Sequence, residues 1–353
     1  MAAPVYLRHP SSLRHETGAH PERPARISAI ERELERRDWL GLDLVEAPSV
    51  DDKVLAAVHP PEHVAAIREL CARGGGALDV DTVVSPGSYE AALHAAGGAV
   101  ALVDILLAGA DDGRPRAGFC GLRPPGHHAE AARAMGFCLF NNIAVAARHA
   151  LRHHGLERVL IVDWDVHHGN GTNDIFHGDA GVLYVSLHQS PLYPGTGGVN
   201  DVGVGAGEGF TINLPLPPGS GDAEFCSLVE HVVAPVAREH RPQLLLISAG
   251  YDAHREDPLA DCEVTEAGYA AMTTTLRQVA EEHDAPVGIV LEGGYALDAL
   301  ARSVAVTLES LCSPGATGAP RAPVHPLAAA AARRLSGSWP SLGVLAGDLP
   351  SGA

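Results

Sequence analysis

The chain has 353 residues, of which 46% are hydrophobic and 19% are charged, and its formal net charge at pH 7 is -18. A chain of this length and composition can bury a large core, as one large α/β domain or as two smaller ones. The negative charge disfavours nucleic acid as a ligand, because a polyanion needs a basic surface, and it favours cationic substrates.

The start of the chain and the spacing of its cysteines lead to an expectation about the cellular compartment. The start of the chain, MAAPVYLRHPSSLRHE, lacks a basic region followed by an apolar stretch, and no run of eighteen apolar residues occurs. We therefore expect a cytoplasmic protein without a membrane partner, and we leave homo-oligomer formation open. The six cysteines form no C-x-x-C pair, which argues against a thiolate metal site and against a disulfide framework.

The first third of the chain predicts three helices, at 21–37, 61–73 and 88–109. In the first of these, Ile27 and Leu34 fall on one helical face, and the charged residues are left for water.

Farther along the chain, helical patterns alternate with short apolar runs that are typical of strands. We predict helices at 141–154, 222–240, 265–283 and 295–312, and strands at 158–165, 181–188, 210–216, 243–252 and 286–295. Continuous apolar runs are what a parallel sheet covered on both faces requires. The alternation therefore predicts one doubly wound α/β domain with a central, mostly parallel sheet.

The last part of the chain is rich in Pro, Ala and Gly. We predict that residues 1–312 form the main domain and that 313–353 form a peripheral segment with one short helix near 326–335.

Two histidines, His127 and His128, stand side by side in the segment LRPPGHHAE. The preceding run Pro124–Gly126 forbids a regular strand, so the backbone turns and can aim both rings into one place. An isolated pair of this kind is more often found on the surface of a loop.

The segment DWDVHHGNGT ends an apolar strand with Asp163, Asp165 and His167. In extended backbone these three side chains project on one side, within reach of one metal ion. Two carboxylates and one imidazole suit Zn²⁺ or Fe²⁺ in a site that keeps one position open. The alternative is a polar strand end whose aspartates cap the next helix.

Asp252, in SAGYDAH, ends a separate apolar run and supplies a further carboxylate. Since the carboxyl ends of parallel strands share one edge of a sheet, Asp165, His167 and Asp252 can form a three-ligand set whose two negative charges neutralise a divalent cation. Such a metal acidifies its bound water less than one held by three neutral histidines, so a nearby general base is useful. His127 and His128 are the candidates for that base.

Six ordered motifs carry a family resemblance: RPPGHHAE, GFCLFNN, DWDVHHGNGT, YPGTG, GYDAHREDPL and LEGGY. Together they resemble the zinc-dependent histone deacetylase family, closest to its class II and bacterial deacetylase-like amidohydrolase members, over roughly residues 5–312. The resemblance implies the arginase/deacetylase fold, with the active site at the carboxyl ends of the strands, and a catalytic domain over 1–312. It also implies Asp165, His167 and Asp252 as Zn²⁺ ligands, with Fe²⁺ or Co²⁺ as other suitable metals.

The resemblance further implies roles for the residues around the metal. His127 and His128 would flank the metal-bound water, and Tyr295 would polarise the acyl carbonyl. Asp163 would orient His127, and Asn170 would orient His128. Because a buried carboxylate stabilises an imidazolium and a neutral amide does not, we expect His128 to be the general base and His127 to be the more easily protonated.

Other positions match the family's substrate tunnel. Gly136, Phe137 and Tyr193 correspond to tunnel residues, although core packing is the alternative for the two aromatic rings. Relatives that prefer acetylpolyamines carry an acidic gatekeeper seven positions after the last zinc aspartate, where this chain has Leu259. Arg26 matches an arginine near the product channel, with a helix-surface salt bridge as the alternative.

The resemblance also implies an inner K⁺ site with a structural role. Its matching residues are Asp163, Asp165, His167, Ser186 and Leu187.

The predicted activity is hydrolysis of an acetylated amine, with acetyl-lysine of proteins or peptides as the expected substrate and an acetylpolyamine or a small metabolite as the alternative. A dinuclear manganese ureohydrolase would need a second aspartate where the chain reads Asp252-Ala253-His254. A catalytically inactive acyl-lysine binder is disfavoured by the presence of Tyr295 and of all three candidate ligands.

Overall fold

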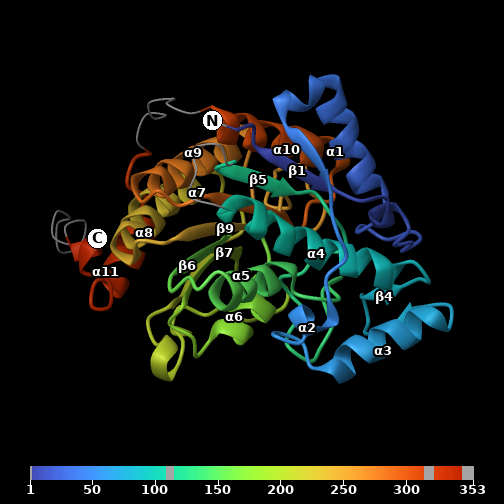
Figure 1. Cartoon of the computed structure of the whole chain (residues 1–353). Coiled ribbons are helices and arrows are strands. Elements are labelled where there is room, and N and C mark those ends of the chain that lie inside the picture. Colours follow the sequence, from blue (N-terminus) through green and yellow to red (C-terminus); the bar gives the residue numbers. More distant parts are fainter. Residues whose placement is uncertain (1, 109–114, 314–321, 344–353) are drawn as a thin grey trace.

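The computed structural model describes residues 2–108, 115–313 and 322–343. Its centre is an eight-stranded sheet in the order β2-β1-β5-β10-β9-β6-β7-β8 (Figure 1). All neighbouring strands of this sheet run parallel, which confirms the predicted sheet type. The strands are β1 (Val5–Arg8), β2 (Asp43–Glu46), β5 (Ala117–Cys120), β6 (Val159–Asp163), β7 (Val182–Gln189), β8 (Thr211–Leu216), β9 (Leu244–Ala249) and β10 (Val287–Leu291).

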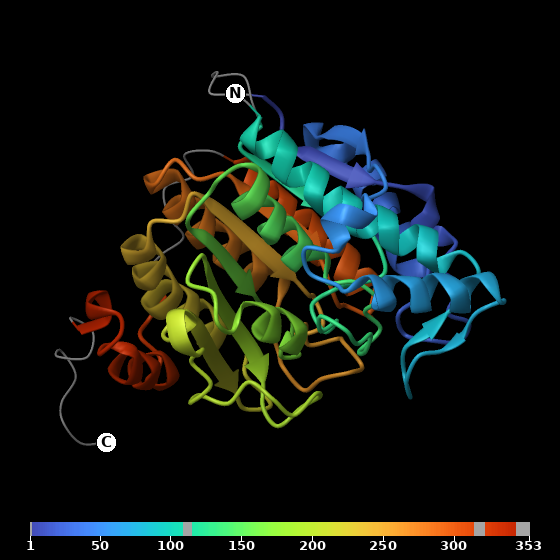
Figure 2. The same ribbon diagram turned by 60° about the horizontal axis from the view of Figure 1, so that its bottom comes forward.

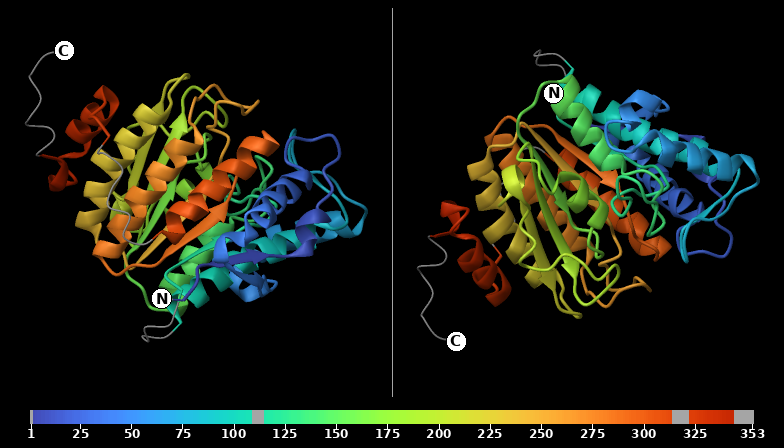
Figure 3. Two further views of the ribbon diagram at one scale, coloured as in Figure 1. Left: turned by 90° about the horizontal axis from the view of Figure 1, so that it is seen from above. Right: turned by 90° about the horizontal axis from the view of Figure 1, so that it is seen from below.

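Helices cover both faces of the sheet, as the two opposite views of Figure 3 show. The larger helices are α1 (Ala25–Arg36), α3 (Pro61–Ala72), α4 (Ser88–Leu107), α5 (Asn142–His153), α9 (Glu266–Glu282), α10 (Leu297–Cys312) and α11 (Pro326–Leu335). The shorter ones are α2 (Asp52–Leu55), α6 (Asn170–Phe176), α7 (Asp222–Leu228) and α8 (Ala234–His240). A small hairpin of β3 (Gly76–Ala77) and β4 (Val83–Val84) stands apart from the main sheet.

The core is divided by the sheet into two main apolar layers. Leu160 and Val162 of β6 pack into the layer beneath α1, α9 and α10, whereas Val159 and Ile161 pack into the layer beneath α4 and α5. Figure 2 brings the face covered by α4 and α5 forward. Because both faces of each central strand are buried, most positions of those strands are apolar, which explains the continuous apolar runs in the sequence.

Helix α4 is the one described helix that is long and apolar enough, by length and composition, to cross a membrane. In this fold 61% of its apolar window is buried, and Ala95, Leu102 and Leu106 pack into the layer between α4 and the sheet. Its apolar composition is therefore accounted for by packing inside the protein.

The predicted strands and helices of the second half are present, with differences at their ends. The helix predicted at 222–240 is α7 and α8 joined by a π-helical turn, Val229–Val233.

In the first half of the chain, the helix predicted from residue 21 begins only at Ala25, because Pro24 occupies its N-cap. The short strands β1, β2 and β5 were not predicted, since four residues are too few to show a period.

The predicted extended backbone from Asp163 to His167 is wrong, because β6 ends at Asp163. After that residue the chain bends, and the backbone N–H of Asp165 donates to the Asp163 carboxylate at 3.1 Å. The N–H of His167 in turn donates to Asp165 Oδ1 at 2.9 Å. Local hydrogen bonds to the aspartates, and not strand alternation, bring these side chains together.

Helix α11 packs against α7 and the π-helical turn outside the sheet. Its Ala328 and Leu335 are buried together with Trp339, and Arg334 donates to the carbonyl oxygen of Val199 at 2.7 Å. Residues 314–321 and 344–353 of the predicted peripheral segment lie outside the described residues.

Candidate active site

Three side chains that follow the central strands β6 and β9 converge at the carboxyl edge of the sheet. The ligand atoms of Asp165, His167 and Asp252 all lie within 4.8 Å of one another, and all three residues are buried. His167 Nδ1 lies 3.1 Å from Asp165 Oδ1 and 3.2 Å from Asp252 Oδ2. The structure therefore brings together the three residues that the sequence predicts as metal ligands.

Backbone groups hold the two carboxylates in place. The N–H of Val166 donates to Asp252 Oδ1 at 3.0 Å, and the N–H of Gly293, which follows β10, donates to Asp165 Oδ2 at 2.8 Å. A Cβ atom at position 293 would lie 2.0 Å from Asp252 Oδ2. Only glycine permits this approach of the β10 loop to both carboxylates.

The charge and donor set of this cluster fit a divalent cation. Asp252 Oδ2 is buried, and His167 Nδ1 lies 3.2 Å from it. Burial and the charge of Asp165 raise the pKa of Asp252. Burial alone would lower the pKa of His167, but hydrogen bonds to Asp165 and Asp252 raise it to about 10. Two buried carboxylates thus draw a proton onto His167, and a divalent cation would supply that positive charge instead.

The tandem histidines lie beside this cluster with ring centroids 4.0 Å apart. The turn that carries them is anchored by Glu292, whose Oε2 accepts the N–H of Gly126 at 2.6 Å and that of His127 at 3.1 Å. His128 faces His167, with ring centroids 5.8 Å apart. The Pro-Pro-Gly turn therefore aims both rings into the site, and both are buried rather than on the surface of a loop.

Each histidine has a different partner on its Nδ1 atom. His127 Nδ1 lies 3.1 Å from Asp163 Oδ2, and His128 Nδ1 lies 2.8 Å from Asn170 Oδ1. Asp163 is the last residue of β6 and Asn170 is the first residue of α6, so the two partners stand at the two ends of the β6–α6 connection. Asp163 also accepts a hydrogen bond from the Tyr184 hydroxyl at 3.0 Å, which fixes its carboxylate.

The surroundings of the two imidazoles shift their pKa values in opposite directions. Burial alone would lower the pKa of His127, but the carboxylates of Asp165 and Asp163 hold that pKa well above its usual range. Burial lowers the pKa of His128 well below its usual range, and the charges of His127 and His167 lower it further. One ring therefore favours the imidazolium form and its neighbour the neutral form.

Tyr295 follows β10 on the LEGGY segment, and its backbone is fixed by Asp257. The Asp257 carboxylate accepts the N–H of Tyr295 at 2.6 Å and the N–H of Ala296 at 3.2 Å. Burial and the charge of Asp252 raise the pKa of Tyr295 well above its ordinary value, so the phenol stays protonated and can donate a hydrogen bond. Asp257 was not predicted as a site residue, although it lies within the motif GYDAHREDPL.

Arg26 supports the same segment from α1. Its Nε atom donates to the carbonyl oxygen of Gly294 at 2.7 Å, and its guanidinium lies 5.1 Å from the centre of the Tyr295 ring. Arg26 is fully buried and pairs with Glu22, which is also buried. The alternative interpretation of Arg26 as a helix-surface salt bridge is therefore wrong.

Aromatic rings flank the approach to the histidines. The ring of Tyr193 meets that of His128 edge to face at 5.1 Å, and Phe137 meets Tyr295 at 5.8 Å. Tyr193 is 37% exposed and Phe137 is half-buried, so neither ring belongs to the core. Gly136 has a φ of +55°, and a Cβ there would lie 2.4 Å from His128 Cδ2, so this position requires glycine.

Two further predicted positions lie around this site. Ser186 is paired with Asp163 in the register of β6 and β7, one residue before Leu187. Leu259 is half-buried, and its N–H donates to Asp257 Oδ1 at 3.0 Å, which links the Leu259 loop to the Tyr295 segment.

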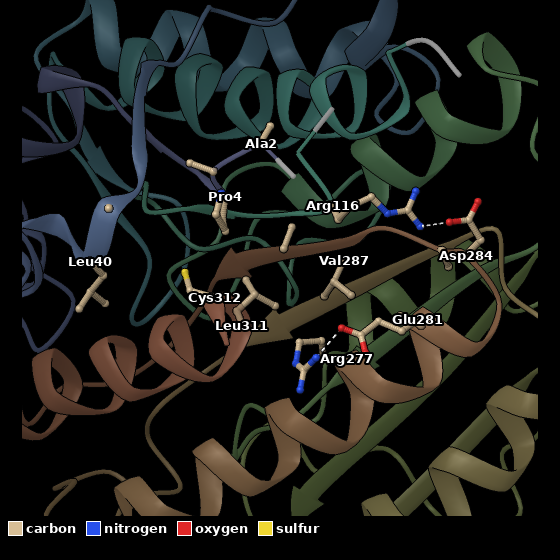
Figure 4. A pocket seen from close by; sticks show the side chains of 15 residues that line it. Ala2, Pro4, Leu40, Arg116, Arg277, Glu281, Asp284, Val287, Leu311 and Cys312 are labelled. Carbon is tan, nitrogen blue, oxygen red and sulfur yellow. Dashed lines mark hydrogen bonds and ion pairs between the residues drawn. The ribbon is translucent and has the colours of Figure 1, made fainter. Parts of the chain in front are cut away.

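A pocket of about 610 Å³ lies at the opposite, amino edge of the strands, near the start of β5 and β10 (Figure 4). It is bordered by Leu311 and Val287 and by an ion pair in which Arg116 lies 2.6 Å from Asp284. It contains none of the residues of the cluster described above.

A parallel α/β sheet with buried carboxylates, an imidazole and tandem histidines at its carboxyl edge is the arrangement of a candidate metal-dependent hydrolase. The family model for the histone deacetylase domain matches residues 20–311. The chain therefore belongs to the histone deacetylase family.

Curated relatives and a solved structure agree with this assignment. The chain is 40% identical over 318 residues to histone deacetylase 14, chloroplastic, of Arabidopsis thaliana, which covers 85% of this chain and 75% of the relative. It is 43% identical over 256 residues to a histone deacetylase-like amidohydrolase of Pseudomonas aeruginosa, covering 72% and 66%. The crystal structure of the HDA15 HD domain matches with a TM-score of 0.89 and 36% identity, over 98% of this chain and 97% of that chain.

Proposed function

We propose that the protein is a Zn²⁺-dependent amidohydrolase that removes acetyl groups from lysine side chains of proteins or peptides. The observation that carries the proposal is the asymmetric pair of histidines, one bound to Asp163 and the other to Asn170, beside three buried ligand residues. A binding module has no need of one basic and one neutral imidazole at the same point, whereas acid–base catalysis requires both.

Asp165, His167 and Asp252 would hold the metal, for which Fe²⁺ or Co²⁺ are also suitable. When bound, such an ion polarises the acetyl carbonyl and acidifies water. The Nδ1–H group of His128 donates a hydrogen bond to Asn170 Oδ1. The Nε2 atom of the ring is therefore free to accept a proton from the attacking water. The Tyr295 hydroxyl donates to the carbonyl oxygen as negative charge develops there.

The remaining proton transfer completes the hydrolysis. A bond forms between the water oxygen and the acetyl carbon, and the bond from that carbon to nitrogen breaks. The departing nitrogen takes a proton from a protonated histidine, and the imidazolium of His127 stabilises the negative charge while the bond breaks. The products are acetate and a free amine.

Supporting roles follow from the same geometry. Phe137 and Tyr193 would grip the aliphatic part of the substrate, and the Gly136 carbonyl would accept its amide proton. Asp163, Asp165, His167, Ser186 and Leu187 would hold a structural K⁺ ion. We further propose that residues 1–312 are the catalytic domain, that the remainder is peripheral, and that the enzyme works in the cytoplasm without nucleic acid.

The dinuclear ureohydrolase alternative receives no support from the residues around Asp252. His254, the second residue after it, is buried with Nε2 3.4 Å from Glu266 and accepts the N–H of Glu256 on Nδ1. Among the described residues, the group of possible metal ligands at this edge of the sheet consists of three side chains, Asp165, His167 and Asp252.

A second candidate substrate class, the acetylpolyamines, is favoured by acidic groups near the tunnel. Burial and the charge of Asp81, in the β3–β4 hairpin, raise the pKa of Tyr193. Negative charge there attracts a distant ammonium group. Leu259 opposes this, because an apolar side chain at the gatekeeper position offers no partner for the ammonium.

The test combines metal analysis with a substrate panel. The purified chain should lose activity on chelation and regain it with Zn²⁺, Co²⁺ or Fe²⁺. We expect a higher kcat/KM for an acetyl-lysine peptide than for N-acetylputrescine or N-acetylspermidine at moderate salt. A tenfold preference for a polyamine would reverse the substrate assignment, and activity that survives complete metal removal would contradict the mechanism.

A further inference from the structure

A second cluster of metal-ligating side chains lies far from the candidate active site, between α4 and α5. It consists of Asp104 on α4 with His149, His153 and His154 at the end of α5, and its ligand atoms all lie within 4.8 Å of one another. The two helices lie side by side (Figure 1). We propose that these four residues form a metal site for a divalent transition-metal ion that prefers imidazole, such as Zn²⁺.

The geometry brings three imidazoles around one carboxylate. His149 Nε2 and His154 Nε2 both lie 2.7 Å from the same Asp104 oxygen. The His153 ring lies 4.7 Å from that of His149 and 5.1 Å from that of His154, measured between centroids. In a tetrahedral zinc site with bonds of about 2.0–2.1 Å, ligand atoms are roughly 3.3 Å apart, so small side-chain rotations complete the site.

The donor set selects the class of metal. Three imidazoles and one carboxylate suit Zn²⁺, Co²⁺, Ni²⁺ or Cu²⁺, whereas Ca²⁺ and Mg²⁺ require oxygen ligands. Two Nε2 atoms facing one carboxylate oxygen must both carry protons in the absence of metal, and a divalent ion would take the place of those two protons. His149 and His153 are four residues apart on α5 and so lie on the same helical face, and His154 follows as the C-cap residue.

The surroundings also favour a cation. Asp104 lies in the last turn of α4, which ends at Leu107, and His153 is the last residue of α5. The C-termini of helices carry partial negative charge, so two helix ends add to the attraction of Asp104. Since β5 and β6 begin after these helix ends, the cluster lies at the amino edge of the sheet, opposite Asp165 and Asp252.

The side chains are accessible to an ion from solution without unfolding. The Asp104 side chain is 48% exposed, and those of His149 and His154 are 11% and 21% exposed. His153 is exposed and has no hydrogen bond among the described residues, so it is available as a ligand. Metal bound here would tie the end of α4 to the end of α5.

The test counts zinc ions bound by the full-length chain after removal of metal with a chelator and dialysis against Zn²⁺. We expect two ions per chain for the wild type. His153→Ala should retain one ion and bind the second at least about tenfold more weakly, because loss of even an outer-shell partner costs about 10- to 100-fold in affinity. His153→Ala should leave deacetylase activity unchanged, because His153 is exposed at the amino edge of the sheet, opposite the candidate active site.

Matched variants separate this site from the candidate active site. His94→Ala, which removes a histidine stacked on His9 at 3.4 Å outside the cluster, should still bind two ions. Asp252→Asn should lose the active-site ion and retain the one at His153. The proposal is overturned if the wild type binds only the ion that Asp252→Asn removes, or if His153→Ala binds two ions with unchanged affinity. Loss of zinc in His153→Ala alone would support this site even if Asp252 proved not to be a ligand.

Discussion

His128 Nδ1 lies 2.8 Å from the amide oxygen of Asn170, so the Nδ1–H group of the ring donates a hydrogen bond to a neutral partner. His127, its neighbour in sequence and in space, faces the carboxylate of Asp163 instead. His127 therefore has a charged partner on its Nδ1 atom, and His128 has a neutral one.

Asn170→Asp should move the pH dependence of activity. A carboxylate next to His128 would raise its pKa, and a base that must be neutral then works only at higher pH. We expect the acid limb of the kcat/KM profile to shift upward by about one to two pH units. Because the Asn170 amide also donates to Glu130 at 3.1 Å, Asn170→Asp with Glu130→Gln is the matched variant without carboxylate repulsion. An acid limb that does not move in either variant would contradict the role of His128 as base.

Tyr295→Phe should lower kcat by roughly 10²- to 10³-fold, the range for the loss of one donor to a developing oxyanion. Metal content should not change, because Tyr295 is not a ligand. Tyr269→Phe is a suitable control, since the Tyr269 hydroxyl is buried with no hydrogen-bond partner among the described residues. The measurement is steady-state kinetics. A kcat of Tyr295→Phe within threefold of the wild-type value would disprove the assignment.

Asp252→Asn should remove bound metal and activity together. The amide oxygen still accepts the N–H of Val166, so the fold is retained while one negative ligand charge is lost. Elemental analysis and circular dichroism of the same sample check the two expectations. A folded variant with full metal content and low activity would mean that Asp252 acts on catalysis without holding the metal.

Leu259→Glu should shift substrate preference toward acetylpolyamines. A carboxylate at a partly desolvated mouth attracts the distant ammonium of a polyamine, which leucine does not. The ratio of kcat/KM for N-acetylspermidine to that for an acetyl-lysine peptide should rise, and more so at low salt. Leu259→Gln, which is polar and uncharged, is the control, and equal ratios in both variants would place the gatekeeper elsewhere.

His240 should make the fold less stable in mild acid. Burial lowers its pKa to about 4, so the folded protein keeps this ring neutral where an unfolded chain would bind a proton at a pKa near 6.5. The unfolded state therefore binds more protons as pH falls from above 6.5 towards 4, and stability is lost in that window. The loss attributable to His240 at pH 5 is about 2 kcal/mol.

His240→Phe removes this titration and retains the ring contacts with Phe210 and Trp339. Urea unfolding at pH 8 and pH 5 should show a smaller loss of unfolding free energy for the variant than for the wild type. An identical pH dependence in the two proteins would mean that His240 is not a neutral buried residue.

The sequence alone determined the sheet type and the main catalytic candidates. Buried parallel strands require continuous apolar runs, so β6, β9 and β10 were visible, and the carboxyl ends of such strands meet at one edge. Asp165, His167 and Asp252 were predicted to meet for that reason, and the structure brings them together. The tandem histidines were recognisable because a Pro-Pro-Gly run must turn.

Only the tertiary structure decided which distant groups support these residues. Asp257 holds the backbone of Tyr295, and Asp104 meets His149 across two helices, although neither pair has a fixed spacing in sequence. Local patterns report the period of one element, whereas contacts between elements depend on how helices and strands pack. For the same reason the bend after Asp163 was missed, since the hydrogen bonds that produce it form only when the aspartates fold back on their own backbone.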